Sequence, residues 1–155
     1  MRIMKKNMLF LFIGGLLLFS SCSLEENPPY DLKFIHIMKD EASSTTVSSK
    51  ANTVSTYNVY LSAPASQETV TVTYEIIVGE GLTENVDYKL LTKETSLVFL
   101  PGIYDMPIRI QWYPNPIDPE KDNSIKIRLL TNDKGYSIGL PGPDKNQSEF
   151  TITKI

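Results

Sequence analysis

The stretch VTVTYEI at residues 70–76 alternates apolar side chains with hydroxyl-bearing or acidic ones. A period of two places the two sets on opposite faces of an extended chain, so this stretch predicts a strand with one face in a core. The same alternation recurs from about residue 31 to the C-terminus. We expect strands at residues 32–38, 57–61, 70–76, 88–91, 97–100, 106–112, 125–129, 136–138 and 150–153.

Turn-forming residues separate these stretches, and no interval between them is both long and periodic enough to predict a helix. Seven to nine short strands with regular turns predict an all-β fold, an antiparallel immunoglobulin-like β-sandwich. The Ser/Thr-rich segment 41–56 is expected to be a long loop or a ragged edge strand. Gly and Pro gather in the turns at residues 63–64, 79–81, 101–102, 114–119, 133–135 and 141–143.

The first 22 residues have the layout of an export signal. Three basic residues lie among the first six, and residues 8–19 form an apolar run. This run is too short to span about 30 Å of hydrocarbon as a helix, so it predicts a cleaved signal peptide. The small residues Ser20 and Ser21 directly precede Cys22, where they suit the narrow site of a signal peptidase.

The segment FSSC at residues 19–22 resembles the lipobox of bacterial lipoproteins, although Phe19 stands where the family prefers a Leu-type residue. In that family the cysteine thiol takes a diacylglyceryl group, cleavage makes the cysteine residue one, and its amine receives a further acyl chain such as palmitate. Two or three acyl chains anchor a protein stably in a membrane. The resemblance implies an outer-membrane lipoprotein lipidated at Cys22. The other interpretation is an ordinary secretory signal.

We therefore expect a signal peptide at residues 1–21, a tether at 22–29 and the sandwich domain at 30–155. Residues 23–26, SLEE, resemble the acidic signal with which some Gram-negative bacteria move lipoproteins to the cell surface. A solvated acidic tether has the same composition, and in that case the domain faces the periplasm. The following NPP at residues 27–29 predicts a stiff spacer, because each proline fixes its φ angle.

Charge and composition exclude several classes of function. The chain has 15 basic and 18 acidic residues, a net charge of −3; removing the leader with its three basic residues leaves 12 against 18, or −6. This balance argues against a nucleic-acid partner, which needs clustered cations. One cysteine excludes an internal disulfide, and one histidine, His36, excludes a two-histidine metal site.

Six segments between residues 70 and 155 resemble, in order, the Calx-beta domain, a calcium-associated immunoglobulin-like sandwich. The resemblance implies the same fold and a calcium site in the acidic loop. In the family this loop ends in a glutamate before an aromatic strand, where Asn123 and Ser124 stand here. The segments are VTY at 72–74, GEG at 79–81, VDY at 86–88, LVFLPG at 97–102, DPEKD at 118–122 and IKIRL at 125–129.

The order of leader, short tether and single sandwich is similar to that of small lipoproteins that accompany outer-membrane glycan-uptake systems of the starch-utilisation type. This likeness is one of architecture, and for function it is an analogy. It implies that polysaccharides or outer-membrane uptake proteins are partners of this chain.

Asp118, Glu120 and Asp122 form the candidate calcium site, since they offer three carboxylates within five residues. Calcium takes six to eight oxygen ligands, so these carboxylates supply part of a set that Asp87 and Asn115 complete if the loops converge. The other interpretation is a solvated hairpin tip that keeps the domain soluble.

Trp112 and Tyr113 are neighbours on an expected strand, so only one of them can face the core. Alternation with the preceding isoleucines assigns Trp112 to the core and turns Tyr113 outward beside Asn115. Aromatic faces are common platforms for sugar rings, and amides bind the hydroxyl groups. Tyr113 and Asn115 are therefore candidate ligand-binding residues. Three further tyrosines are candidates for exposed aromatic rings: Tyr57, Tyr60 and Tyr104.

No motif for catalysis is present: there is no phosphate-binding loop, nucleophile elbow or HExxH sequence, and no pair of acids stands out for glycosidase chemistry. His36 lies on the strand face shared by Phe34 and Met38 and is expected to be structural. We expect a non-catalytic binding module, accessory to polysaccharide uptake. The alternative is an interaction module that binds a protein by strand addition at a sheet edge, for example along residues 45–56.

Lipidation at Cys22 predicts that the Cys22→Ala variant leaves the membrane fraction. The substitution removes the thiol that carries the diacylglyceryl group, so acyl chains no longer anchor the protein in the bilayer. Fractionation of cells expressing either form, followed by immunoblotting, measures the effect. Full retention of the variant in the membrane would show that the lipoprotein interpretation is wrong.

Overall fold

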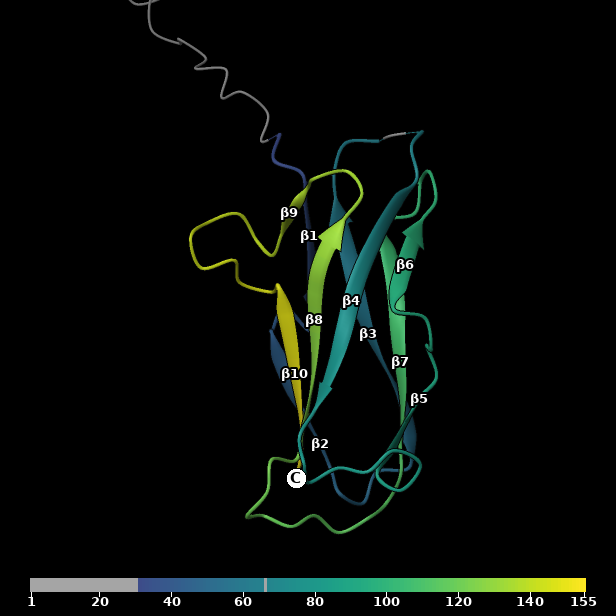
Figure 1. The fold of residues 1–155 in the computed structure, drawn as a ribbon, viewed down its shortest axis with the longest axis vertical. Coiled ribbons are helices and arrows are strands. Elements are labelled where there is room, and N and C mark those ends of the chain that lie inside the picture. Colours follow the sequence, from purple (N-terminus) through teal and green to yellow (C-terminus); the bar gives the residue numbers. More distant parts are fainter. Residues whose placement is uncertain (1–30, 66) are drawn as a thin grey trace, which may run out of the picture. The chain divides into compact units, whose positions relative to one another are not determined.

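The computed structural model describes residues 31–65 and 67–155, which form two five-stranded sheets packed as a sandwich (Figure 1). The leader, Cys22 and the tether lie outside these ranges. In the described ranges every regular element is a strand, and no helix is long and apolar enough to cross a membrane. The strands are β1 (Phe34–Met38), β2 (Ser44–Val47), β3 (Thr53–Ser62), β4 (Val70–Val78), β5 (Tyr88–Leu90), β6 (Ser96–Phe99), β7 (Asp105–Trp112), β8 (Ser124–Asn132), β9 (Ser137–Ile138) and β10 (Glu149–Lys154).

One sheet has the strand order β5-β7-β3-β1-β9, and the other has the order β2-β10-β8-β4-β6. Neighbouring strands are antiparallel except for two edge pairs, β1 with β9 and β10 with β2, which are parallel. All other neighbours follow the antiparallel arrangement expected from the sequence, and only these two edge pairs depart from it. The chain passes from β1 to β2 through a tight turn at Asp40 and Glu41, which both have positive φ angles (51° and 64°), and thereby changes sheet.

The core lies between the sheets and is built from alternate residues of each strand, as the period of two predicts. Trp112 is fully buried, which confirms its assignment by alternation. Its indole Nε1 donates to the Tyr57 hydroxyl at 3.4 Å, and the Tyr57 ring lies 5.4 Å from that of Phe150. Tyr57 is only 1% exposed and faces inward beside Val59. The prediction that its ring is exposed is therefore wrong.

All nine expected strands are present, and the all-β sandwich is confirmed. The tenth strand, β2, lies in the Ser/Thr-rich segment and is the edge strand that the sequence left open as one of two interpretations. The same segment also contains the start of β3 at Thr53, where two exposed residues, Thr53 and Val54, pair with β7. Short Ser/Thr-rich strands show little hydrophobic periodicity. The sequence pattern alone therefore does not distinguish a strand from a loop in this segment.

Three connections meet near the C-terminus of the chain (Figure 1), and we call residues 48–52, 79–87, 113–123 and 154–155 together the loop end. The Gly81 amide donates to the Asp122 carbonyl at 2.9 Å, and the Asn115 amide donates to the Ser49 carbonyl at 3.0 Å. Gly79 packs so tightly here that a Cβ atom would clash with the Asp122 carbonyl oxygen. The loops are therefore held against one another by backbone contacts.

Candidate functional site

A buried ion pair lies at the centre of the loop end. Lys154 continues the inward series of Phe150 and Ile152 along β10, so strand alternation carries its side chain into the interior. The Lys154 side chain is 0% exposed and that of Asp87 is 4% exposed, with Nζ 2.8 Å from Oδ1. Burying two charges is costly unless they are paired and further hydrogen-bonded.

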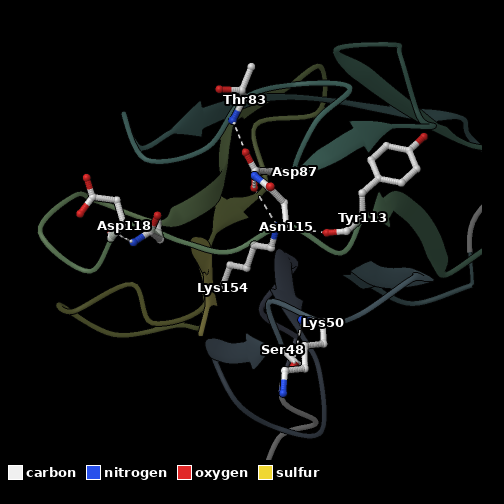
Figure 2. A network of polar contacts seen from close by, with 9 residues as sticks. Ser48, Lys50, Thr83, Asp87, Tyr113, Asn115, Asp118 and Lys154 are labelled. Atoms are coloured by element: carbon white, nitrogen blue, oxygen red, sulfur yellow. Dashed lines mark hydrogen bonds and ion pairs between the residues drawn. The ribbon is translucent and has the colours of Figure 1, made fainter.

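Neighbouring groups supply these further hydrogen bonds (Figure 2). Asp87 Oδ1 also accepts a hydrogen bond from Asn115 Nδ2 at 2.9 Å, and Oδ2 accepts one from the Thr83 amide at 2.9 Å. Lys154 Nζ donates to the Tyr113 carbonyl at 3.1 Å, and the Tyr113 amide donates to the Asp87 carbonyl at 3.0 Å. The network thus joins β10 to two connections of the loop end, residues 79–87 and residues 113–123.

The protonation state of Asp87 follows from two opposed effects. Burial acts to raise the pKa of the Asp87 carboxyl, but hydrogen bonds from Lys154, Asn115 and the Thr83 amide, with the charge of Lys154, outweigh it. The pKa of Asp87 is therefore held below its ordinary value. The group is an ionised carboxylate at neutral pH.

Asp87 and Asn115 do converge, as the sequence suggested, but around a cation that belongs to the chain itself. The Lys154 ammonium sits where two oxygens, Asp87 Oδ1 and the Tyr113 carbonyl, point. Lys154 was not among the residues predicted from the sequence. Its burial could have been inferred from its position two residues after Ile152 and four after Phe150, which places it on the inward face of the strand.

The acidic loop uses its carboxylates locally. Asp118 Oδ1 accepts a hydrogen bond from the Glu120 amide and Asp122 Oδ1 accepts one from the Ser124 amide, both at 3.1 Å, while Glu120 is exposed. Asn123 is buried and donates to the Asp118 carbonyl at 2.7 Å. Across the described ranges no three acidic, histidine or cysteine side chains group closely enough to hold a metal ion. Calcium binding by this loop stays a prediction.

Tyr113 and Asn115 do not form a joint surface in this arrangement. The half-buried Tyr113 ring points away from the network, whereas Asn115 points toward Asp87 (Figure 2). Asn115 lies between Pro114 and Pro116, which restrict the backbone on both sides of it. Its side-chain Nδ2 donates to Asp87, and ligand binding by Tyr113 and Asn115 stays a prediction.

A second feature is a row of three rings on the outer face of the first sheet: Phe34, His36 and Tyr60, which we call the aromatic row. His36 pairs with Tyr60 across β1 and β3. The ring centroids are 5.3 Å apart for Phe34 and His36 and 5.5 Å apart for His36 and Tyr60, with the latter pair stacked. Phe34 and His36 were predicted to share one strand face, but the addition of Tyr60 was not predicted, because this pairing depends on the register of two strands.

His36 is the inner member of the row. It is 8% exposed, and its Nδ1 atom is buried without a hydrogen-bond partner. Burial lowers the pKa of the His36 imidazole below its ordinary value. The ring is therefore neutral at pH 7 and contributes a flat surface rather than a charge.

A polar hollow of about 390 Å³ lies between β2 and the segment that leads into β10. Gln147, one of the lining residues, also contacts strand β1: the Gln147 carbonyl accepts a hydrogen bond from the Ile37 amide at 2.9 Å. Hydroxyl, amide and charged groups dominate the lining, which consists of Ser43, Ser44, Asp144, Lys145, Asn146, Gln147, Ser148, Glu149 and Thr151.

No protein-family model and no curated protein sequence matches this chain.

Replacement of Lys154 by methionine tests the buried ion pair. The Lys154→Met variant should lower the free energy of unfolding by about 3–5 kcal/mol, because it leaves Asp87 buried without a cation. Lys126→Met is the matched control: Lys126 lies 3.0 Å from Glu149 in a partly exposed pair, so its loss should cost less than about 1 kcal/mol. Urea unfolding at pH 7 measures both. Equal, small losses would contradict a structural role for the pair.

The buried imidazole of His36 predicts a pH dependence of stability. Since its folded pKa is depressed, the unfolded chain binds the proton more readily, and the stability present above about pH 6.5 is lost as the pH falls. His36 is the only histidine in the sequence, so a His36→Phe variant should lack this loss. Unfolding free energies measured from pH 7 to pH 5 test this. Identical slopes for the two proteins would contradict it.

Proposed function

We propose that this protein is a lipid-anchored lipoprotein of the bacterial cell surface whose sandwich is a non-catalytic polysaccharide-binding module, accessory to glycan uptake. The observation that carries the proposal is the aromatic row. The SLEE segment that follows Cys22 supports surface exposure, and the lipobox supports anchoring.

The aromatic row offers the apolar part of a sugar-binding surface. Sugar rings have apolar C–H faces that stack on aromatic rings, and neighbouring rings extend the contact along a chain. Phe34 and Tyr60 are half-buried, so each keeps an accessible part while its base is fixed by packing. His36 between them holds both rings at centroid distances below 6 Å.

Polar groups lie beside the row and would bind sugar hydroxyls. Asp105 is paired with Tyr60 across β3 and β7, and paired residues project to the same face of a sheet. Asn58 lies two residues before Tyr60 on β3, and is therefore also on that face. An aromatic platform with a few flanking amide and carboxylate groups is the arrangement expected of a binding module for polyhydroxylated ligands.

Affinity electrophoresis through gels containing different polysaccharides tests the proposal. At least one polysaccharide should retard the protein, and Tyr60→Ala should weaken that binding by about tenfold or more, the equivalent of roughly 1.4 kcal/mol of lost stacking. Tyr104→Ala is the matched control, because Tyr104 is 38% exposed and lies outside the row. Circular dichroism verifies that each variant is folded.

Two outcomes would contradict the proposal. If no member of a broad panel of neutral and acidic polysaccharides retards the protein, the domain does not bind polysaccharides. Retardation that Tyr60→Ala and Phe34→Ala both leave unchanged would show that binding occurs away from the row.

The edge of the second sheet favours the alternative, a protein-interaction module. β6 is the outermost strand of its sheet, and three apolar residues in and after it are well exposed: Val98 at 44%, Leu100 at 58% and Ile103 at 42%. Exposed edge strands accept an added strand, and a lysine on such an edge blocks this. A Val98→Lys variant that loses a co-purifying membrane protein but keeps polysaccharide binding would assign a second role to this edge.

A further inference from the structure

We propose that Lys154 and Asn115 join through an intramolecular amide bond, formed with release of ammonia, and that Asp87 carries the protons for this reaction. The inference does not depend on the binding function proposed above. It rests on the placement of an amine, a carboxylate and a carboxamide in the network of the loop end.

A single carboxylate oxygen contacts both nitrogens that the reaction involves. Asp87 Oδ1 lies 2.8 Å from Lys154 Nζ and 2.9 Å from Asn115 Nδ2, so the two nitrogens are no more than about 6 Å apart. One oxygen in contact with both the attacking and the leaving nitrogen is the arrangement that a proton carrier between them requires. Figure 2 shows the three side chains directed toward one another.

The pair is shielded from water. The side-chain exposures are 0% for Lys154 and 4% for Asp87, and Nζ lies 2.8 Å from Oδ1, so a proton can pass directly between them. Transfer of this proton from Nζ to Oδ1 leaves two neutral groups in a buried site, where charges are costly, and frees the lone pair of the amine. Asp87 is ionised at neutral pH, so it is in the form that accepts the proton.

The reaction balances with the groups that are present. Lys154 Nζ gives a proton to Asp87, and its lone pair forms a bond to Asn115 Cγ. The bond from Cγ to Nδ2 then breaks, with Asp87 passing one proton from Nζ to the departing nitrogen. The products are a secondary amide and ammonia, and Asp87 ends protonated, so no buried charge is left without a partner and no oxidant or cofactor is needed.

The bond would close a covalent loop from residue 115 to residue 154, which links the β7–β8 connection to the last strand of the domain. The two prolines beside Asn115 restrict how far this side chain can move from Asp87. Strand β10 lies inside its sheet between β2 and β8, so locking its end opposes removal of the C-terminal strand. Such a lock suits a domain exposed to proteases at a cell surface.

Mass spectrometry of tryptic peptides tests the proposal on the full chain, purified from membranes and unfolded in urea before digestion. Acylated lysine resists trypsin, so the expected product is peptide 110–121 joined to peptide 146–155, with Lys154 uncut. Its mass should be about 17 Da below the sum of the two peptides, which corresponds to ammonia. Peptide analysis is unaffected by lipid on Cys22.

Three variants complete the design. Asn115→Ala keeps the ion pair of Lys154 and Asp87, so it should fold but give the two peptides separately. Asp87→Ala should also abolish the joined peptide. Asn146→Ala is the control, since this exposed asparagine lies in the same tryptic peptide as Lys154, and the joined product should persist.

Two results would overturn the proposal. Fully separate peptides from the wild-type protein, with cleavage after Lys154, would show that the groups form only an ion pair. Linkage of Lys154 to peptide 51–89, which contains Asp87, with a loss of about 18 Da for water, would show that Asp87 rather than Asn115 is the partner.

Discussion

The burial of Lys154 beside Asp87 is the constraint on which the loop end depends. Two charges inside a small sandwich destabilise it unless every polar atom around them has a partner. The Thr83 amide, the Asn115 side chain and the Tyr113 carbonyl supply these partners, and they come from two separate connections. The loops must therefore hold one relative position, and the close approach of Gly79 to the Asp122 carbonyl fits only that position.

This arrangement separates the buried network and core from the outer face that carries the proposed binding surface. The core and the loop end immobilise the strands through inward-facing residues, while the outward-facing residues of β1 and β3 carry the aromatic row. A platform built on paired strands holds its rings more rigidly than one built on a loop. Lys126, Arg128, Glu75 and Glu149 form a ladder of ion pairs across β4, β8 and β10, so the outer face of the second sheet is charged there.

Local sequence patterns predicted much of the fold because strand formation with one buried face leaves a period of two. The strands around Trp112 and Ile127 were found in this way. The parallel edge pairs, the stacking of His36 on Tyr60 and the meeting of Asp87 with Lys154 were not, because each depends on register between segments far apart in the chain. Asn115 illustrates the limit: its position after the strand was correct, but its amide faces Asp87 rather than the surface beside Tyr113.

Native-state hydrogen exchange of backbone amides tests most directly whether the buried pair holds the loop end together. The amides of Thr83 and Tyr113 both donate to Asp87, although they lie in connections and not in strands. If the buried pair holds the loops in place, these two amides exchange only when the whole domain unfolds. They should then exchange as slowly as the amide of Ile127 in the centre of β8. Exchange as fast as that of Lys134, in the exposed β8–β9 turn, would show that the loops open independently of the core and would contradict this account.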